Sequence, residues 1–420
     1  MLDRTVQPAF QKSTAFDLLH PETITLKNNL PITLVRGGEQ AVARIEFIFD
    51  AGKWHEEQPG VSYFTSHQLQ KGTPSKNSYQ ISSETEQRGV HFEVSPGHDF
   101  TSLSLYGLTK NISEVFELTR EIITRPIFPQ AELDQAKDIY NQTLKINLEK
   151  TSYLASRELR KTLFGNNHPY GQDATISEIA KIQRAWLVGF HQAQFSNFRI
   201  ICSGKITDPV LKHLTDTFGT IQLHRSSERM LITSSPVKSS NHIVEKKDSV
   251  QASLRLGRHV VGRTHEDYAA LLLLNHIFGG YFGSRLMKNI REEKGLTYGI
   301  NSSVAALKHA SYLTIGTDVN KENAELAIRE IKNEMNALCT QLIGTAELET
   351  ARNHFIGSLQ LEITTPFAHA DKIKNLLLFS LPANYYQELI LKIDSLSQQD
   401  LLQAANTYLD PLTFNTVTVG

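Results

Sequence analysis

The sequence AELDQAKDIYNQTL at residues 131–144 occurs again, in altered form, as AELETARNHFIGSL at residues 346–359. Both copies keep Ala-Glu-Leu, then an acid, an alanine, a base, an aromatic residue and a leucine at matching places. Each copy follows an amphipathic helical segment, residues 111–128 in the first half and 320–338 in the second. A repeat of this length indicates a duplicated structural unit.

Strand-like segments precede each helical pair. Residues 89–108 and 299–319 alternate apolar and polar positions, with turn residues between the alternating runs. Each half is therefore predicted to be an α+β unit, a largely antiparallel sheet with long helices on one face. We expect two homologous domains, residues 1–225 and 243–420. The Ser-rich and charged segment at 226–242 is predicted to link them.

Composition excludes several classes of function. A chain of 420 residues is long enough for two hydrophobic cores. Its 43 Lys and Arg residues nearly balance 44 Asp and Glu residues, so no strong field favours nucleic acid or anionic lipid. The N-terminus has no signal-peptide pattern, and no stretch approaches the roughly 20 apolar residues of a membrane span. We therefore expect a cytoplasmic protein without nucleic-acid or membrane partners.

The segment FDAGKWHEEQPGVSYFTSHQLQKGT, residues 49–73, bears on the chemistry. A helix with the pattern His-x-x-Glu-His places two imidazoles on one face, where they bind zinc while the glutamate activates water. The segment resembles the surroundings of this motif in the insulinase/pitrilysin family of zinc metallopeptidases. The likeness is to the branch of two-domain chains that includes the mitochondrial processing peptidase subunits, and it covers nearly the whole chain.

Three zinc-site positions depart from that family pattern. Tyr63 stands where the first histidine belongs, Ser66 replaces the glutamate, and only His67 remains. The resemblance places a third ligand, a glutamate, near residue 142 or 143, where this chain has Gln142 and Thr143. Catalytic zinc normally needs three protein ligands. We therefore predict that this chain binds no metal.

The second half keeps a different family segment, FGGYFGSRLMKNIREEKGLTYG at residues 278–299. Leu286 and Ile290 lie four apart, as expected for the buried side of a helix. Arg291 and Tyr298 match a pair that, in the family, binds the substrate backbone and stabilises the reacting carbonyl. The residue types suit that role, because a guanidinium holds a carbonyl and a phenol donates a hydrogen bond to a developing oxyanion.

Three further polar stretches have weaker signals. WHEE at residues 54–57 is interpreted as surface charge, and HDF at 98–100 has no identifiable partner. NNHPYGQD at 166–173 is interpreted as a shaped loop in which His168 has a structural role.

The resemblance implies a role for a chain that keeps the arginine and tyrosine but not the zinc ligands. In some bacterial members of the family, one subunit supplies the zinc motif, its partner supplies the Arg/Tyr pair, and the two enclose an unfolded peptide. We expect this chain to be the non-catalytic, cofactor-free subunit of such a heterodimer, inactive alone. The zinc then belongs to a homologous partner subunit, although a homodimer stays open.

Two other functions stay open as well. One is a structural or assembly subunit, like the core proteins of respiratory complexes, which share this fold without peptidase activity. The other is a self-sufficient metallopeptidase with an unorthodox metal site, which predicts bound zinc and chelator-sensitive activity.

Overall fold

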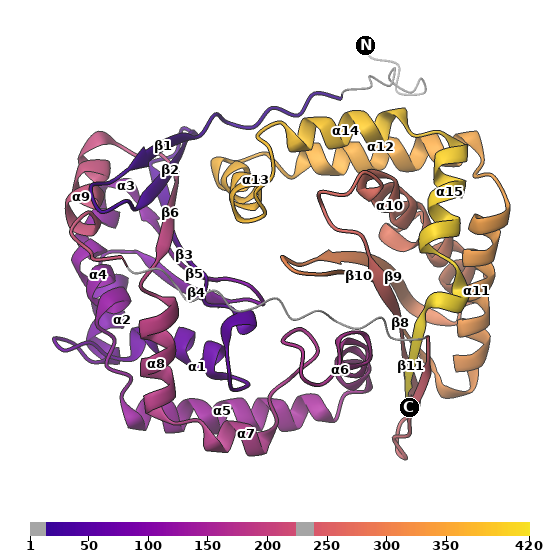
Figure 1. The fold of residues 1–420 in the computed structure, drawn as a ribbon, viewed down its shortest axis with the longest axis horizontal. Coiled ribbons are helices and arrows are strands. Elements are labelled where there is room, and N and C mark those ends of the chain that lie inside the picture. Colours follow the sequence, from indigo (N-terminus) through magenta and orange to yellow (C-terminus); the bar gives the residue numbers. More distant parts are fainter. Residues whose placement is uncertain (1–13, 224–238) are drawn as a thin grey trace, which may run out of the picture.

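The computed structural model describes residues 14–223 and 239–420, which form two α+β halves, each on its own sheet (Figure 1). The first-half sheet has the strand order β1-β2-β6-β3-β5-β4. Its strands are Glu22–Thr25 (β1), Pro31–Arg36 (β2), Val42–Phe49 (β3), His91–Pro96 (β4), Thr101–Leu108 (β5) and Phe198–Gly204 (β6). Neighbouring strands are antiparallel except for the parallel pair β2 and β6.

The helices of the first half pack mainly on one face of this sheet, around a large apolar core. They are Val61–Gln68 (α1), Ser78–Gln87 (α2), Thr109–Ile112 (α3), Phe116–Thr124 (α4), Gln130–Leu148 (α5), Thr151–Phe164 (α6), Ile176–Lys181 (α7), Arg184–Gln194 (α8) and Asp208–Phe218 (α9). The strand-like alternation predicted over residues 89–108 is confirmed in β5, because Leu103 and Leu105 are buried while Tyr106 is exposed.

The second half repeats this plan with the strand order β7-β11-β8-β10-β9. Its strands are Asn241–Val244 (β7), Gln251–Val260 (β8), Thr297–Ala306 (β9), Ser311–Asn320 (β10) and Asn415–Val419 (β11). Its helices are Tyr268–Asn275 (α10), Ala324–Thr340 (α11), Thr345–Leu361 (α12), Pro366–Leu378 (α13), Tyr385–Ser395 (α14) and Gln398–Tyr408 (α15). Two π-helical segments, His276–Gly280 (η4) and Met287–Glu293 (η5), follow α10.

The repeated sequence corresponds to equivalent helices. The copy at 131–144 lies in α5 and the copy at 346–359 lies in α12, and each helix is followed by a further one, α6 or α13. The α+β class with two homologous domains is therefore confirmed. The linker predicted at 226–242 falls mostly on residues outside the described ranges, so these domain limits stay a prediction.

The two halves exchange helices across their interface. Helix α6 of the first half packs on β8 and β11 of the second, where Leu159 and Leu163 meet Val417 and Val419. Helix α13 of the second half packs on β2 and β6 of the first, where its Ile373 joins the apolar cluster. The prediction of helices on one face thus holds for the helices that pack on the sheet of their own half. Helices α6 and α13 instead cover the opposite face of the other half's sheet.

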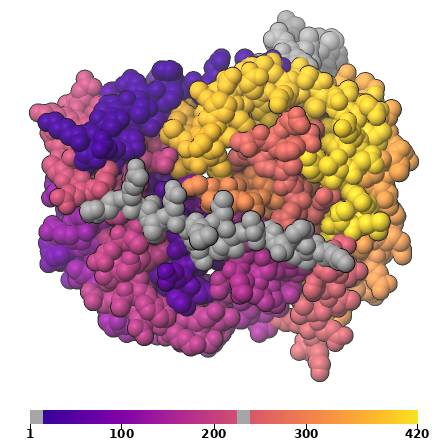
Figure 2. All heavy atoms as spheres, viewed as in Figure 1, coloured from indigo at the N-terminus to yellow at the C-terminus, as the bar shows by residue number. Residues whose placement is uncertain are grey.

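The N-terminal end of the described chain adds a third connection between the halves. Phe16 is buried in the core of the second half, with its ring 5.4 Å from that of Tyr386. Its backbone N–H donates a hydrogen bond to the side-chain oxygen of Gln387 at 2.9 Å. In Figure 2 the N-terminal strands (indigo) border the C-terminal helices (yellow) along the top of the molecule. Within the described ranges, the search for a helix of membrane-spanning length and apolarity found none.

Candidate functional site

Helix α1 carries the altered zinc motif, and its start is held by a buried carboxylate. Gly60 precedes the helix with φ 93°, a backbone conformation that suits glycine. The carboxylate of Glu56 accepts hydrogen bonds from the backbone N–H groups of Gly60, at 3.1 Å, and of Ser62, at 3.0 Å. Such groups at a helix N-terminus lack partners within the helix. The interpretation of residues 54–57 as surface charge is therefore wrong for Trp54 and Glu56, which are buried, although Glu57 is exposed.

Aromatic rings pack together at the positions of the missing zinc ligands. The ring centroid of Tyr63 lies 4.2 Å from that of His67 and 4.9 Å from that of Tyr140 on α5. Burial, assisted by Lys71, lowers the pKa of His67. Burial raises the pKa of Tyr63, and it raises the pKa of Tyr140 to about 12, so both phenols are neutral near pH 7. The surviving histidine is thus covered by a neutral ring instead of facing a second imidazole.

The remaining motif positions supply no carboxylate. Ser66 is fully buried, donates a hydrogen bond to the carbonyl of Ser62 at 2.7 Å, and shares another with the Thr101 hydroxyl at 3.2 Å. Gln142 and Thr143 lie exposed on α5. A search of residues 14–223 and 239–420 found no group of three or more His, Cys, Asp or Glu side chains that could hold a metal ion.

We therefore expect zinc to leave the stability of the purified chain unchanged. A ligand that binds only the folded state at 1,000 times its Kd would add about 4 kcal/mol to the free energy of unfolding. Thermal unfolding with and without zinc, together with the metal content after dialysis, checks this expectation. One equivalent of retained zinc and a raised Tm, both abolished by His67→Ala, would contradict it.

A small pocket opens beside the altered motif. It has a volume of about 270 Å³ and is lined by Tyr63, Tyr140, Lys53, His98 and Asp173, among others. Lys53 comes from the segment between β3 and α1, whereas Asp173 belongs to the loop before α7. The altered site is thus a polar and aromatic pocket without metal-binding geometry.

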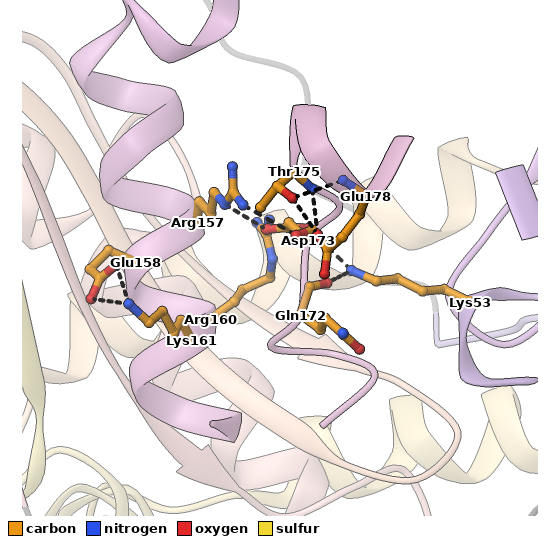
Figure 3. Close-up of polar contacts among 9 residues, drawn as sticks. All are labelled: Lys53, Arg157, Glu158, Arg160, Lys161, Gln172, Asp173, Thr175 and Glu178. Atoms are coloured by element: carbon orange, nitrogen blue, oxygen red, sulfur yellow. Dashed lines mark hydrogen bonds and ion pairs between the residues drawn. The ribbon is translucent and has the colours of Figure 1, made fainter. Parts of the chain in front are cut away.

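Three cations converge on Asp173 (Figure 3). The Asp173 carboxylate lies 3.1 Å from Lys53 Nζ, 3.8 Å from Arg157 Nε and 2.7 Å from Arg160 Nη2. Burial opposes ionisation of this carboxyl, but Lys53 and Arg160 outweigh it and hold the pKa of Asp173 below its ordinary value. These contacts therefore tie the loop at 166–173 both to α6 and to the segment between β3 and α1.

The turn between β9 and β10 contacts buried residues of the first half. The phenol of Tyr170 donates a hydrogen bond to the carboxylate of Asp99, and the backbone N–H of His309 donates to the Tyr170 hydroxyl at 3.3 Å. The second carboxylate oxygen of Asp99 accepts from the backbone N–H of Lys308 at 3.0 Å. The buried ring of Trp54 stacks on His309, with centroids 4.0 Å apart. We call these five residues the interdomain latch.

The latch supplies the partner that residues 98–100 lack in the sequence. Asp99 bonds to Tyr170 of the same half and to residue 308 of the other half. His168 has the structural role predicted for it, since it is buried and its Nδ1 accepts the backbone N–H of Tyr170 at 3.1 Å.

Arg291 and Tyr298 come together at one end of the second-half sheet. Arg291 lies in the π-helical segment η5, and Tyr298 is the second residue of β9. The guanidinium carbon of Arg291 lies 4.9 Å from the ring centroid of Phe282 and 5.4 Å from that of Tyr298. These cation–π distances place the guanidinium beside both rings. Phe282 is 62% exposed and Tyr298 is 92% exposed, so the cluster faces outward.

A β-bulge positions Tyr298. Two residues of β9, Tyr298 and Gly299, oppose the single residue Asp318 of β10. The hydroxyls of Thr297 and Thr317 each donate a hydrogen bond to the carbonyl of Gly299 at 3.0 Å, which fixes the bulge. Bulges are over-represented at sheet edges and beside active sites, where they redirect a side chain. β9 is the edge strand of its sheet.

Buried apolar side chains and one ion pair hold the helical segment that precedes this cluster. Leu286 and Ile290 are fully buried, as the four-residue spacing predicts. Arg285 forms two hydrogen bonds of 2.8 Å to the carboxylate of Glu347, which belongs to the second copy of the repeat. The side-chain hydrogen bond from Arg285 lowers the pKa of Glu347 and keeps it charged. This ion pair therefore connects the segment from 285 to 291 directly to α12.

Besides the latch, sequence reasoning missed Tyr140 at the altered motif and Phe282 beside Arg291. Phe282 has a signal only in hindsight, as an aromatic residue in the glycine-rich stretch before Arg291. Tyr140 lies in the repeat, where an aromatic residue is conserved between the copies at 140 and 355. Its contact with Tyr63 depends on how α5 packs against α1.

Known proteins share both the sequence pattern and the fold. The family model described as insulinase (peptidase family M16) matches residues 33–172, and the model described as peptidase M16 inactive domain matches residues 181–355. An uncharacterized zinc protease, YmxG of Bacillus subtilis, is 24% identical over 345 residues, 81% of this chain and 83% of that protein. The protein called non-peptidase homolog YmxG of Helicobacter pylori is 25% identical over 375 residues, 86% of this chain and 84% of its own length.

Two crystal structures have the same fold over almost the whole chain. A peptidase M16 inactive domain from Pseudomonas fluorescens superposes with a TM-score of 0.86 at 24% identity, covering 96% of this chain and 98% of that one. A protease from Helicobacter pylori superposes with a TM-score of 0.85 at 19% identity, covering 96% of this chain and all of the other.

Proposed function

Since the chain belongs to the insulinase family, peptidase family M16, we propose that it is the zinc-free, non-catalytic subunit of a heterodimeric peptidase. One contrast carries the proposal. The aromatic rings of Tyr63, His67 and Tyr140 pack together at the altered zinc motif, whereas Tyr298 is exposed and lies against the half-buried Arg291. The name of the Helicobacter pylori relative, non-peptidase homolog, is consistent with a subunit that is not itself catalytic.

The substrate is an unfolded peptide in this proposal. Arg291 holds a backbone carbonyl of the peptide, and Tyr298 donates a hydrogen bond to the oxygen on which negative charge develops. The ring of Phe282 also lies beside this guanidinium, with its centroid 4.9 Å from the guanidinium carbon. The zinc and the water-activating glutamate come from a homologous partner subunit, because α1 of this chain offers neither.

The exposed cluster is suited to meet such a partner. Aromatic residues and arginine are enriched at the centres of protein interfaces. A phenol that is 92% exposed makes few contacts within its own chain, so its packing contributes little to stability there. The β-bulge and the two threonine hydroxyls nevertheless fix the position of Tyr298. This is best explained if the Tyr298 phenol contacts a molecule outside this chain.

The test is a reconstitution with peptide cleavage as its readout. The purified chain, a homologue from the same genome with an intact zinc motif, and an equimolar mixture are each incubated with an unfolded peptide. We expect turnover only in the mixture, abolished by a zinc chelator. A stable complex without turnover would favour an assembly role, and chelator-sensitive cleavage by this chain alone would favour a self-sufficient metallopeptidase.

A further inference from the structure

A polar cavity lies between the two halves, separate from the altered zinc motif. Its volume is about 320 Å³, and it is lined by α6 of the first half and by β8, β9 and β10 of the second. Gly299 and Gly316, on neighbouring strands, leave part of its wall without side chains. A Cβ on Gly316 would lie 3.4 Å from the side chain of Arg255, and a Cβ on Gly299 would meet nothing within 4 Å.

Arg255 enters this cavity from β8 in a fixed orientation. Its Nε donates a hydrogen bond to the Ser156 hydroxyl at 3.1 Å, and its Nη1 donates to the carbonyls of Leu254 and Thr317 at 2.9 and 3.1 Å. Its Nη2 has no hydrogen-bond partner among the described residues. One edge of the guanidinium is thus held by the protein while one donor nitrogen stays available.

Arg160 and Tyr312 add further donors from opposite sides. Arg160 uses Nη2 for Asp173, and its Nε is buried without a partner within the described ranges. Tyr312 lines the cavity from β10, and no partner of its hydroxyl is found in residues 14–223 or 239–420. Burial raises the pKa of this phenol, although the charge of Arg160 opposes the shift, so the hydroxyl keeps its proton and can donate.

The charges of the cavity favour an anion. Two arginines and one carboxylate, Asp318, are among the described residues that line it. Asp318 lies 3.4 Å from Arg255, and the Asp173 paired with Arg160 is shared with Lys53 and Arg157. A guanidinium N–H that is not already bonded donates a charge-assisted hydrogen bond to a carboxylate.

The cavity adjoins the Arg/Tyr cluster. A groove beside Tyr298 and the cavity share two lining residues, Gly299 and Asp318. A volume of 320 Å³ is at the small end of the range for ligand pockets, enough for the end of a peptide but not for a folded segment. A peptide held at Arg291 and Tyr298 therefore has a short path along β9 into the cavity.

We propose that this interdomain cavity binds the C-terminal carboxylate of the peptide, an inference that rests on the proposed function. Arg255 and Arg160 supply the charge, and the Tyr312 hydroxyl donates an additional hydrogen bond. The subunit then recognises a free chain end in addition to an extended backbone.

The test compares two peptides of the same sequence, one with a free C-terminus and one with an amidated C-terminus. Isothermal titration with the purified full-length chain is expected to show that the free acid binds at least about tenfold more tightly, because a hydrogen bond to a charged group is stronger than one to a neutral amide. Tyr312→Phe, which removes one oxygen, and Arg160→Gln are both expected to reduce this ratio toward one.

Lys161→Gln is the matched control for Arg160→Gln. It also removes one positive charge from α6, but Lys161 pairs with Glu158 on the side of the helix away from Asp173 (Figure 3). This variant is expected to keep the full difference between the two peptides. If both peptides bind the unaltered chain equally, or neither binds at millimolar concentration, the inference is overturned. An amidated peptide with a terminal glutamate that binds as well as the free acid would also overturn the chain-end assignment.

These outcomes are separable from those of the proposed function. Cleavage of the amidated peptide by the mixture of subunits needs Arg291 and Tyr298 but no free chain end. If that cleavage occurs while the carboxylate preference is absent, only the cavity assignment fails. If the preference is present but the mixture cleaves neither peptide, the proposed function fails and the carboxylate site stands.

Discussion

Replacing Tyr298 by phenylalanine is expected to lower kcat of the mixed complex by about 10²- to 10³-fold, the usual cost of removing one donor to a developing oxyanion. The variant keeps the ring, which is 92% exposed, and therefore its packing beside Arg291 at 5.4 Å. Because the hydrogen bond forms with charge that appears in the transition state, KM should change little. Steady-state kinetics on an unfolded peptide measures both constants.

Arg291→Ala should act differently from Tyr298→Phe. It removes the group proposed to hold the peptide carbonyl before reaction, so KM should rise as well as kcat fall. The control is Tyr79→Phe, which alters another exposed tyrosine, on α2 of the first half. Size-exclusion chromatography should show the same heterodimer for all variants. Unchanged kinetics for Tyr298→Phe in an active complex would exclude the phenol from the chemistry.

Replacing Trp54 by alanine is expected to lower the free energy of unfolding by about 3–5 kcal/mol, as for other large aromatic side chains removed from cores. Trp54 is 1% exposed, and it stacks on His309 of the other half and contacts Tyr170. Its loss would leave a cavity in the interdomain latch. Urea denaturation followed by circular dichroism gives the change as a lower midpoint.

Trp186→Ala provides the comparison for this variant. Trp186 is partly buried against the first-half core and takes no part in the latch, so the same substitution there should cost less. A loss below about 1 kcal/mol for Trp54→Ala would show that the latch contributes little to joining the halves.

Much of the fold could be predicted because each pattern that indicates it is contained in a short stretch of sequence. The repeat at 131–144 and 346–359 indicates duplication by direct comparison, and alternation over a single strand is sufficient to predict its buried face. The packing of α6 and α13 leaves no such signal, because the same amphipathic pattern buries a helix against its own sheet or against the other one. The prediction of helices on one face was therefore incomplete.

The residues of the candidate site likewise divide into those that local sequence reveals and those that only tertiary contacts reveal. Residues 63, 66 and 67 show which zinc ligands are missing, but Tyr140, which covers the position, lies more than 70 positions further along the chain. Asp99 finds its partners at 170 and 308, so no window of sequence shows the latch. Arg291 and Tyr298 were identified through the resemblance to the family, whereas their mutual contact and the part played by Phe282 required the three-dimensional path of the chain.

The exchange of α6 and α13 has a consequence for how the molecule can come apart. A polypeptide ending after α9 would keep its own sheet but lose the helix that covers Val35, Ile48 and Ile201. The complementary piece would lack Leu159 and Leu163 over β11. Each fragment would leave part of its hydrophobic core exposed to water. The two halves are therefore expected to fold together. Two separately expressed halves should recover their native state only by fragment complementation.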